Sequence, residues 1–588
     1  MFTNTRKADI MNIVIREKFL SQRLLAEASG CSLGMVNQCL RELEEDGLVE
    51  PMGMPTEKAR KLAEMHKPRN AIILAAGYGM RMVPINTELP KGLLQVHGEP
   101  LIERLICQLH EVGIREIHIV VGFMKEHYEY LIDKYAVNLI TNPDYASANN
   151  LHSLALVSEY ISNTYVMPCD IWCAVNPFRS GELYSWYMVS DRMKQESPVR
   201  VNRKRELVLT KKDQAGNNMI GISYLTGDVA TYLVQRLREM DGQRAYQNAF
   251  WEDALYSGNK LLAYARVVSG TEVVEINTYE QLRTLDENSD QLKTDAIAVI
   301  CDTLKVQPSE IVEITVLKKG MTNRSFLFCC RDQKYIMRIP GEGTGELINR
   351  AQEAQVYQAI ADLRICDDIA YINPENGYKI TKYLEDARVC DLEDAQDLQK
   401  CMTRLRQFHE MGLQVDHTFD IFERMDFYES LWGEIPSAYG DYWQTKQNVR
   451  SLIPYIEAHK TASVLTHIDA VPDNFLFTNG DQDIRLIDWE YAGMQDPHVD
   501  IAMFCIYALY NRRQVDSLID LYFTEGCTEA NRIKIYCYIA ACGLLWSNWC
   551  EYKRNLGVEF GEYSLCQYRY AKDYYRVVCE ELEKNGMV

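Results

Sequence analysis

The spacing of hydrophobic and polar residues changes twice along the chain, and each change marks a candidate domain boundary. In residues 1–67 apolar positions recur every three or four residues, which predicts short amphipathic helices. Gly30 suits the C-terminal end of one helix, and Ser32 and Thr56 suit the N-terminal ends of two more. Residues 48–53 favour a short hairpin. The first segment is therefore predicted to be a small helical domain with one hairpin.

From residue 70 apolar strands alternate with amphipathic helices. Residues 71–74 form a continuous apolar run, and the pattern continues with helices at 101–112 and 128–135 and strands at 116–121 and 138–141. This alternation predicts a doubly wound parallel sheet with helices on both faces, an α/β domain spanning residues 68–285. A charged stretch begins the third segment, residues 286–588, which is predicted to be a separate pair of lobes.

Composition places the chain among ordinary globular proteins. Hydrophobic residues make up 47% and charged residues 25% of the 588 residues, a length that accommodates about three domains. The net charge of −20 argues against nucleic acid as the main partner. The N-terminus lacks the apolar run of a signal peptide, the apolar stretch 535–546 is too short to span a membrane, and the 18 cysteines lack metal-ligand spacing. We therefore expect a cytoplasmic protein with reduced thiols.

The first segment resembles a winged helix-turn-helix domain, through the helix pair around Gly30 and the hairpin that follows. Residues 1–67 hold ten Lys or Arg and ten Asp or Glu. The candidate recognition helix offers Asn37, Gln38 and Arg41 but ends in four acidic residues. Because phosphate attraction supplies most non-specific affinity for DNA, a dimerisation or docking role is favoured over DNA binding.

A glycine-containing loop follows the first strand of the second segment. Ala75 ends the strand, and Gly77 and Gly79 would let the backbone approach a triphosphate, whose oxygens accept main-chain N–H bonds. Arg81 could pair with the same phosphates, and Lys91 could neutralise charge on the phosphate under attack. The loop is therefore predicted to bind a nucleotide, with Arg81 and Lys91 as catalytic cations.

Two runs, LAAGYGMRM and PINTELPKGLLQVHGEPLIE, resemble the sugar-phosphate and phosphocholine nucleotidyltransferase family over residues 70–285. A dinucleotide-binding loop is the rival interpretation, but Val83 stands where its third glycine would be. The chain departs from the family at Met80, where a small Ser or Thr is usual. The resemblance implies a nucleoside triphosphate substrate, CTP in the phosphocholine branch.

The resemblance also implies carboxylates that hold Mg²⁺ against the α-phosphate. Asp170 follows the apolar strand 165–167 and matches the strand-end aspartate of the family. Glu252 is the best match for the second metal ligand, and Asp253 is the alternative. The pair could equally be acidic residues at a helix N-terminus.

Residues for the nucleobase and the acceptor are less specific. Asn150 and Ser153, in an Asn-rich run that resembles the phosphocholine branch, could bind the base or the acceptor, or could cap a helix. Trp172, Trp186 and Tyr187 offer aromatic faces for a quaternary ammonium, although each could equally be a core aromatic. We take Trp186 and Tyr187 as candidate substrate-binding residues.

The third segment carries the spacing of a phosphotransferase catalytic loop. His467, Asp469 and Asn474 stand in the order H-x-D-x-x-x-x-N, and Asp488 ends an apolar strand soon after. Asp469 is predicted to accept the proton of an alcohol. Asn474 and Asp488 are predicted to hold the Mg²⁺ that bridges the phosphates of ATP.

Upstream residues complete a candidate ATP site. Thr322 and Asn323 lie in a short loop suited to covering phosphates, and Arg338 takes the strand position of the protein-kinase lysine. Glu353 on the next helix could pair with Arg338, or the two could form only a surface salt bridge. The segment has no Asp-Phe-Gly or Ala-Pro-Glu motif, which excludes a protein kinase.

The motifs GMTNRSF, YIMRIPG, THIDAVPDNFLF and LIDWEYAGMQDPHVDIA resemble the choline/ethanolamine kinase family over residues 295–588. The resemblance implies a protein-kinase-like bilobal α+β fold and an amino-alcohol substrate. Glu490, Tyr491, Trp546 and Trp549 would cage a cation that has no N–H donors, because aromatic faces and a carboxylate attract it without hydrogen bonds. A tryptophan pair at i, i+3 is otherwise core packing.

The two resemblances constrain each other, because a kinase that makes phosphocholine and a transferase that consumes it share one intermediate. The sequence thus predicts a bifunctional enzyme that converts choline, ATP and CTP to CDP-choline, ADP and pyrophosphate. Ethanolamine or a related amino-alcohol as substrate, a sugar kinase joined to a sugar-phosphate transferase, and a choline-sensing transcriptional regulator are the alternatives. A homo-oligomer is compatible with the sequence.

Overall fold

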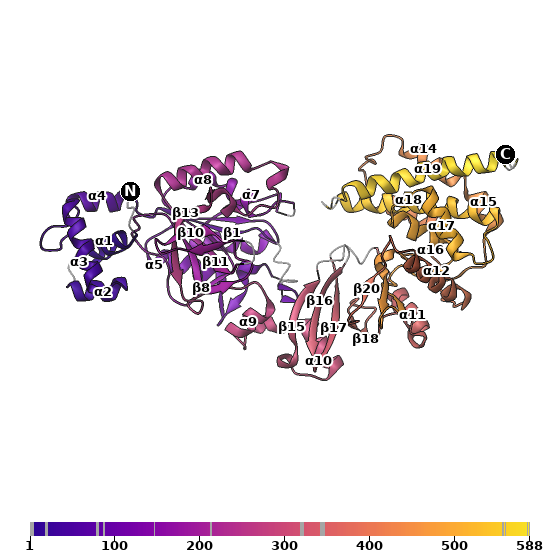
Figure 1. Cartoon of the computed structure of the whole chain (residues 1–588), viewed down its shortest axis with the longest axis horizontal. Coiled ribbons are helices and arrows are strands. Elements are labelled where there is room, and N and C mark those ends of the chain that lie inside the picture. Colours follow the sequence, from indigo (N-terminus) through magenta and orange to yellow (C-terminus); the bar gives the residue numbers. More distant parts are fainter. Residues whose placement is uncertain are drawn as a thin grey trace. The chain divides into compact units, whose positions relative to one another are not determined.

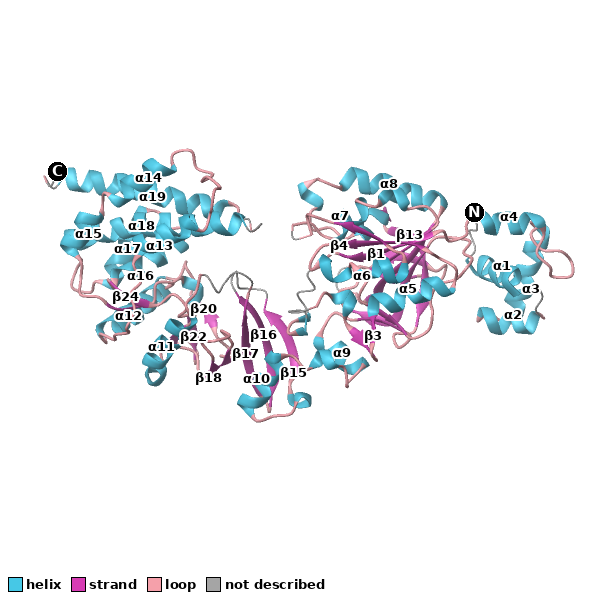
Figure 2. Cartoon of the chain, turned by 180° about the vertical axis from the view of Figure 1, so that it is seen from behind, coloured by secondary structure: helices cyan, strands magenta, loops and turns pink. Residues whose placement is uncertain are grey.

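The chain forms two compact units, Met1–Asp295 and Ala296–Val588, in the computed structural model (Figure 1, Figure 2). The structure describes residues 5–17, 21–77, 82–85, 89–145, 147–211, 214–317, 323–341, 347–555, 558, 560–584 and 586. The first unit holds a small helical domain and an α/β domain. The second unit holds a β-rich lobe and a helical lobe.

The small domain has the element order that the sequence predicts. Its helices are α1 (Thr5–Glu17), α2 (Gln22–Ser29), α3 (Leu33–Glu45) and α4 (Glu57–Met65). Gly30 ends α2 with a φ of 62°, and the side chains of Ser32 and Thr56 accept backbone hydrogen bonds in the first turns of α3 and α4. A β-bridge between Val49 and Pro55 closes the wing. The winged helix-turn-helix prediction is confirmed.

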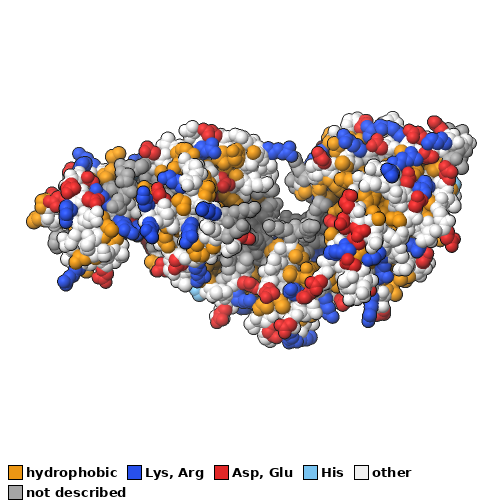
Figure 3. Space-filling model, in the orientation of Figure 1, with side chains coloured by type: hydrophobic (Ala, Val, Ile, Leu, Met, Phe, Trp, Pro, Cys, Tyr) orange, Lys and Arg blue, Asp and Glu red, His pale blue; other side chains and the backbone are white. Residues whose placement is uncertain are grey.

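The winged helix contacts the α/β domain through α1 and the end of α4. Asp9 accepts hydrogen bonds from the hydroxyl of Tyr184, at 2.9 Å, and from the guanidinium of Arg205, at 2.7 Å. The ring of His66 lies 2.9 Å from the hydroxyl of Thr226. Acidic and basic side chains are intermingled on the face of the winged helix that Figure 3 shows. The contacts at Asp9 are a docking interaction within the chain, whereas dimerisation stays a prediction.

The strands of the α/β domain are β1 (Asn70–Ala75), β2 (Gln95–Val96), β3 (Glu99–Pro100), β4 (Glu116–Val121), β5 (Asn138–Thr141), β6 (Thr164–Pro168), β7 (Ile171–Cys173), β8 (Trp186–Lys194), β9 (Val199–Val201), β10 (Glu206–Leu209), β11 (Gly216–Leu225), β12 (Tyr256–Ser257), β13 (Lys260–Val268) and β14 (Val273–Glu275). Its helices are α5 (Leu101–Glu111), α6 (Tyr130–Tyr135), α7 (Asn150–Ala155), α8 (Gly227–Met240) and α9 (Tyr279–Leu285), with the 3-10 turns η3 (Lys91–Leu93), η4 (Lys125–Tyr128), η5 (Ser158–Tyr160), η6 (Arg244–Tyr246), η7 (Trp251–Leu255) and η8 (Asp290–Leu292).

The main sheet has the strand order β5-β4-β1-β6-β11-β8-β13-β10-β9. The expected parallel arrangement holds for β5, β4, β1 and β6, and β11 then joins β6 and β8 in the antiparallel direction. The sheet is therefore mixed. Leu74 pairs with Pro168, so the chain leaves β1 and β6 at the same edge. Ligands of such sheets bind beyond the carboxyl ends of the strands, which places a candidate site there.

Alternate residues of β1 face opposite helical layers. Ile73 packs in the cluster that contains α5, and Ile72 packs in the cluster that contains α7 and α8 (Figure 1). Every residue of β1 is buried, because helices cover both faces of the sheet. The continuous apolar run in the sequence has this cause.

The strands of the second unit are β15 (Val312–Leu317), β16 (Asn323–Cys330), β17 (Gln333–Pro340), β18 (Ile369–Ile372), β19 (Lys379–Lys382), β20 (Arg388–Val389), β21 (Val464–Thr466), β22 (Phe475–Thr478), β23 (Asp483–Leu486) and β24 (Gly493–Gln495). Its helices are α10 (Asp295–Leu304), α11 (Arg350–Ile360), α12 (Ala395–Glu410), α13 (Ile421–Ser430), α14 (Tyr442–Arg450), α15 (Ile453–His459), α16 (His498–Tyr507), α17 (Arg512–Tyr522), α18 (Glu529–Asn555) and α19 (Glu562–Lys584), with the 3-10 turns η9 (Pro308–Glu310), η10 (Ala361–Leu363) and η11 (Pro472–Asn474).

An antiparallel sheet and a buried helix organise the two lobes of this unit. The sheet has the order β15-β16-β17-β19-β18, and α11 lies in the chain between β17 and β18, as expected for a kinase-like fold. In the helical lobe every residue of α18 from Ile533 to Lys553 is buried. The apolar stretch 535–546 is therefore the middle of a core helix. Among the described residues no helix is both long and apolar enough to cross a membrane, and none of the 18 cysteines, all described, forms a disulfide.

Candidate active sites in the two units

The loop after β1 forms one side of the first candidate site. Ala75 is buried at the end of β1, and a methyl group added at Gly77 would meet no atom of the described residues within 4 Å. The backbone at Gly77 therefore has an open side that a phosphate could approach. Gly79 and Arg81 lie outside the described residues.

Lys91 begins η3 and joins two oxygen-bearing side chains from distant parts of the chain. Its ammonium donates to Oδ2 of Asp170 at 2.7 Å and to Oδ1 of Asn277 at 3.0 Å. The side chains of Lys91 and Asp170 are only 13% and 10% exposed, so this ion pair is shielded from water. Oδ1 of Asp170 is buried and has no hydrogen-bond partner among the described residues. The structure thus brings two predicted residues together and adds Asn277.

The chemistry of this cluster fits Mg²⁺. No group of three or more His, Cys, Asp or Glu in the described part of the chain is arranged to hold a metal ion. Mg²⁺, however, is usually bound by one or two protein oxygens together with substrate phosphates. Asp170 and Asn277 supply such a pair. Sequence reasoning missed Asn277, which reaches Asp170 because it lies two residues after β14, whose Glu275 pairs with Ile171 beside Asp170.

The half-buried Glu252 is paired with the buried Tyr187. The hydroxyl of Tyr187 donates to Oε1 of Glu252 at 2.8 Å, and Oε2 has no partner among the described residues. The pKa of Glu252 is raised to about 7, mainly by burial and in smaller part by the charges of Asp253 and Glu275. Asp253 accepts a hydrogen bond from the backbone of Phe250 and so caps η7. Asp253 therefore lies at the N-terminus of a helical turn. This is the position that the sequence analysis gave as the alternative to a metal site for Glu252 and Asp253.

Asn150 and Ser153 both make structural hydrogen bonds within the domain. Oδ1 of Asn150 accepts from the backbone N–H of Trp251 at 2.9 Å, which ties α7 to η7. The hydroxyl of Ser153 accepts from Asn142 at 3.0 Å. The N-cap of α7 is Asn149.

Two tryptophans of the first unit, Trp172 and Trp186, already have protein cations against their rings. The guanidinium of Arg266 lies 3.6 Å from the ring centroid of Trp186, which is fully buried. The guanidinium of Arg104 lies 4.0 Å from the ring of Trp172. Arg266 also forms two hydrogen bonds with the buried Glu182. The structure therefore places Trp186 in the core, with Arg266 against its ring.

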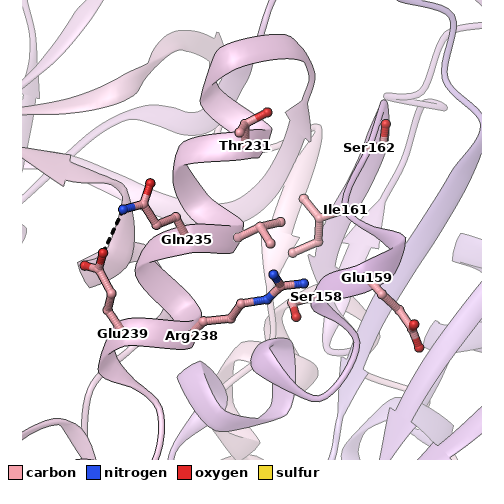
Figure 4. A pocket seen from close by; sticks show the side chains of 9 residues that line it. Ser158, Glu159, Ile161, Ser162, Thr231, Gln235, Arg238 and Glu239 are labelled. Atoms are coloured by element: carbon pink, nitrogen blue, oxygen red, sulfur yellow. Dashed lines mark hydrogen bonds between the residues drawn. The ribbon is translucent and has the colours of Figure 1, made fainter.

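A hollow of about 580 Å³ between η5 and α8 is separate from this site (Figure 4). It lies near the start of β6, whereas Asp170 follows the end of that strand. Its rim carries exposed polar side chains such as Gln235, which donates to Glu239 at 2.8 Å. None of the predicted residues lines it.

The buried carboxyl of Glu252 predicts a pH-dependent stability of the first unit. Its pKa of about 7 in the folded chain exceeds the ordinary value of 4.5, so folding binds a proton between these pH values. Stability should therefore fall as pH rises from 4.5 to 7, by roughly 3 kcal/mol in total, and level off above. Glu252→Gln should flatten this slope.

Differential scanning calorimetry between pH 5 and pH 8 measures the effect. The core variant Val166→Ala identifies the transition of the first unit. Equal pH slopes in the wild type and in Glu252→Gln would contradict the assignment.

The second candidate site is a cleft of about 710 Å³ between the two lobes of the second unit. Nine residues that the sequence singled out line this cleft: Asn323, Arg338, Asp469, Asn474, Asp488, Glu490, Tyr491, Trp546 and Trp549. Thr322 lies outside the described residues. Glu353 is buried next to the cleft.

Hydrogen bonds from α16 hold the catalytic loop in an unusual backbone conformation. Ile468 has a φ of 69°, a left-handed conformation that β-branched residues rarely adopt. The carboxylate of Asp500 accepts from the backbone N–H groups of His467, at 2.9 Å, and Ile468, at 2.7 Å. This arrangement turns the next side chain, Asp469, into the cleft. Sequence reasoning missed Asp500, although it lies in the quoted run LIDWEYAGMQDPHVDIA, which begins with Leu486.

Asp469 and Asn474 are in direct contact. The amide of Asn474 donates to the backbone oxygen of Asp469 at 2.9 Å and to its Oδ2 at 3.2 Å. Burial raises the pKa of Asp469 to about 8, and the charges of Asp488 and Glu490 add to the rise. Asp469 thus holds a proton readily near neutral pH, which suits a general base.

Asp488 and Asn474 supply oxygens for a cation. Burial raises the pKa of Asp488, while the charges of Lys379 and Arg338 lower it. Because Asn474 directs its NH₂ group to Asp469, its carbonyl oxygen is available on the other side. The donor set of one carboxylate and one amide oxygen fits Mg²⁺ in the presence of phosphates.

Arg338 and Glu353 form a buried ion pair, which excludes the surface salt bridge as an interpretation. Their side chains are 6% and 0% exposed, and both guanidinium nitrogens bond the carboxylate. Arg350 donates to Glu353 at 2.9 Å and to Glu490 at 3.1 Å. Asn323 also donates to Glu490 at 3.1 Å. Glu490 is therefore part of the ion network under the cleft as well as of its lining.

Aromatic rings form one wall of the cleft. The ring centroids of Tyr491 and Trp546 are 5.5 Å apart, and those of Trp546 and Trp549 are 5.7 Å apart, both edge to face. Tyr507 and Tyr563 line the same cleft and were not singled out from the sequence. The sequence offers no specific sign of these two tyrosines, because the spacing around neither of them differs from that around tyrosines of the core.

Three family models match parts of the chain. Residues 4–50 match the winged helix-turn-helix DNA-binding model, residues 71–177 the MobA-like NTP transferase domain and residues 314–525 choline/ethanolamine kinase. Each match falls on the part of the chain that carries the corresponding elements.

Individual relatives match the two units separately. The choline-phosphate cytidylyltransferase of Streptococcus pneumoniae is 33% identical over 229 residues, which are 37% of this chain and 96% of the relative. Protein LicA of Haemophilus influenzae is 29% identical over 265 residues, which are 42% of this chain and 75% of the relative. The crystal structure of choline kinase LicA from Streptococcus pneumoniae is 27% identical and covers 48% of this chain and 98% of its own, with a TM-score of 0.43.

Proposed function

The chain belongs to the choline-phosphate cytidylyltransferase family, and from this membership and the cleft of the second unit we propose that the protein makes CDP-choline in two steps. The second unit transfers a phosphoryl group from ATP to the hydroxyl of choline, which yields phosphocholine and ADP. The first unit then transfers the cytidylyl group of CTP to phosphocholine and releases pyrophosphate.

The observation that carries the proposal is the aromatic wall in the same cleft as Asp469. Tyr491, Trp546 and Trp549 line the cleft that also contains the candidate base. Trimethylammonium has no N–H donor, so ring faces and negative charge attract it where hydrogen bonds cannot. Choline bound against these rings could present its hydroxyl to Asp469.

In the kinase step the chain positions the groups and moves one proton. Asp469 accepts the hydroxyl proton as the oxygen attacks the γ-phosphate of ATP. Asn474 and Asp488 would hold Mg²⁺, which neutralises phosphate charge when bound. Arg338, fixed by Glu353, supplies a permanent cation for the phosphates.

In the transferase step Asp170 and Asn277 would hold Mg²⁺ at the edge of the sheet. Lys91, which contacts both, supplies a cation where charge develops on the α-phosphate of CTP. The open backbone at Gly77 gives N–H groups access to the phosphates. Gly79 and Arg81 complete the proposed loop.

Two half-buried acids of the first unit, Glu252 and Glu275, suit the cationic end of phosphocholine. Glu275 is close enough to Glu252 to raise its pKa, so the two carboxyl groups share one region of the site. A trimethylammonium there would favour their ionised forms. Tyr187 adds a ring beside Glu252, whereas Trp186 is covered by Arg266.

We propose residues 1–67, 68–285 and 286–588 as the winged helix, the transferase and the kinase. The first two share one compact unit, and the charged stretch after residue 285 leads to the second. The winged helix then serves as a docking module on the transferase, through Asp9.

A coupled assay tests the proposed function. The purified chain is supplied with Mg²⁺, ATP, one of the four nucleoside triphosphates as the second substrate, and choline or ethanolamine. We expect CDP-choline to form from choline and CTP at the highest kcat/KM. Formation of CDP-ethanolamine at a higher kcat/KM would reassign the substrate, and no cytidylyl product from added phosphocholine would refute the transferase step.

Trp549→Leu should reduce the preference for choline over ethanolamine. The substitution keeps apolar volume but removes a ring face that contributes about 0.5–2 kcal/mol to the binding of a cation, so the KM for choline should rise several-fold to roughly thirtyfold. Ethanolamine can donate N–H bonds to carboxylates and should lose less. The measurement is the ratio of kcat/KM for the two substrates.

The matched control is Trp443→Leu, since Trp443 is 66% exposed and outside the cleft. Trp549 is a favourable target because its indole N–H has no hydrogen-bond partner among the described residues, so leucine breaks no such bond. If the ratio of kcat/KM for choline and ethanolamine is unchanged in Trp549→Leu, Trp549 only packs in the hydrophobic core and does not contact the substrate cation.

A further inference from the structure

A second hollow of the kinase unit, of about 380 Å³, shares no residue with the catalytic cleft. One face of α12, the turn between β22 and β23 and the residue after η10 enclose it. Neither proposed reaction uses any of its side chains. The cationic side chains that line it distinguish this hollow.

Four cationic side chains converge on this hollow: Arg364, Lys400, Arg404 and Arg485. Two acids, Asp481 and Asp483, lie at its edge, and Asp481 is already paired with Arg388 at 2.7 Å. The local charge is therefore positive. This is unusual in a chain whose net charge is −20.

The two central guanidinium groups are held in place without being neutralised. Arg404 donates to the backbone oxygen of Arg364 at 3.2 Å, and Arg485 donates to that of Cys366 at 3.0 Å. Within the described residues no carboxylate oxygen comes within 4.0 Å of either group. Carbonyl oxygens orient these cations, and the charge of Asp483 offsets part of the charge of Arg404 without forming an ion pair with it.

Arg404 also has an unused donor inside the protein. Its Nε is buried and has no hydrogen-bond partner among the described residues. Burial lowers the pKa of Arg404, and the charge of Arg485 lowers it further, so the two guanidinium groups repel each other. A buried donor and a repelling pair of cations are both costly unless an anion satisfies them.

We propose that this hollow binds a small oxyanion of the phosphate class, held between Arg404 and Arg485. A tetrahedral oxyanion accepts two parallel N–H bonds from a guanidinium and would remove the repulsion between the two. Lys400 and Arg364 add charge at the rim. Inorganic phosphate, pyrophosphate and a phosphate ester share this chemistry.

The site is connected to the catalytic cleft through one strand. Arg485 lies on β23, three residues before Asp488, and the next residue, Leu486, donates its N–H to the oxygen of Ile365 at 2.7 Å. Asp367, which follows the Cys366 carbonyl that holds Arg485, lines the catalytic cleft. An oxyanion bound to Arg485 would fix both segments, so it should also raise the thermal transition of the second unit.

Titration calorimetry on the full chain tests the proposal, with inorganic phosphate, pyrophosphate and sulfate as probes. EDTA is present throughout, so that metal-dependent phosphate binding at either active site is suppressed. We expect one site per chain, with an affinity that falls as NaCl is added. Arg404→Gln and Arg485→Gln should each weaken binding about tenfold or more, since each removes charge-assisted hydrogen bonds.

Arg406→Gln is the matched control, because Arg406 lies on the same helix and contacts Glu410 and the backbone of Tyr522 instead. Its affinity should equal that of the wild type. Stronger binding of pyrophosphate than of phosphate would identify a diphosphate as the preferred ligand, and the reverse order a monophosphate. The proposal is overturned if the wild type binds none of the probes, or if Arg404→Gln and Arg485→Gln both bind them as the control does.

Discussion

Asp469→Ala will lower the rate of choline phosphorylation by a factor of roughly 10²–10⁴, while cytidylyl transfer to added phosphocholine continues at the wild-type rate. The carboxyl group is the only candidate base that contacts Asn474 in the cleft of the described chain. Alanine leaves the hydroxyl of choline without a proton acceptor. The first unit has its own cluster at Asp170, so its reaction should not change.

Two variants separate this chemical effect from a folding defect. Asp469→Asn keeps the shape of the side chain, and it removes a carboxyl whose raised pKa means that its ionisation opposes folding above about pH 4. This variant should be inactive as a kinase and no less stable than the wild type at pH 8. Asp473→Ala is the matched control, because Asp473 lines the cleft but bonds Tyr507. Kinase activity in Asp469→Asn near the wild-type level would show that another group accepts the proton.

Asp170→Asn will have the opposite selectivity. Cytidylyl transfer should fall by a factor of roughly 10²–10³, the scale of losing one preorganised electrostatic group, while choline phosphorylation is unchanged. The substitution removes a candidate metal ligand and leaves the buried ammonium of Lys91 without its charge partner. Radiolabelled CTP with phosphocholine measures the first reaction, and coupled ADP detection measures the second.

Asn277 and Asp253 provide an internal comparison for the metal ligands. Asn277→Ala removes an oxygen that contacts Lys91 beside Asp170, whereas Asp253→Ala removes a cap of η7. We expect the first variant to raise the Mg²⁺ concentration needed for half-maximal transfer and the second to leave it nearly unchanged. A larger shift in Asp253→Ala would restore Asp253 as the second ligand.

Lys91→Ala distinguishes a role in the chemical step from a role in binding. Charge increases on the phosphate under attack, so the loss should be mainly in kcat, by roughly tenfold or more. A raised KM for CTP with an unchanged kcat would assign Lys91 to binding alone.

The sequence by itself determined the features that depend on short stretches of chain. The caps at Gly30 and Ser32 follow from the backbone conformations that glycine allows and the hydroxyl bonds that serine offers. The catalytic loop from His467 to Asn474 is likewise local, since its residues contact one another within a few positions. Family resemblance rested on such runs, and so did the assignment of both activities.

The tertiary structure decided which distant side chains meet. Asn277 is 186 positions from Lys91, and only the return of β14 beside β7 brings the two together. Aromatic residues show the same limit. Trp186 and Trp549 look alike in the sequence, but Arg266 covers the ring of Trp186, whereas Trp549 faces the kinase cleft. Local sequence fixes the backbone conformation and the face on which a side chain lies, but the partner opposite that face is set by packing between elements far apart in the chain.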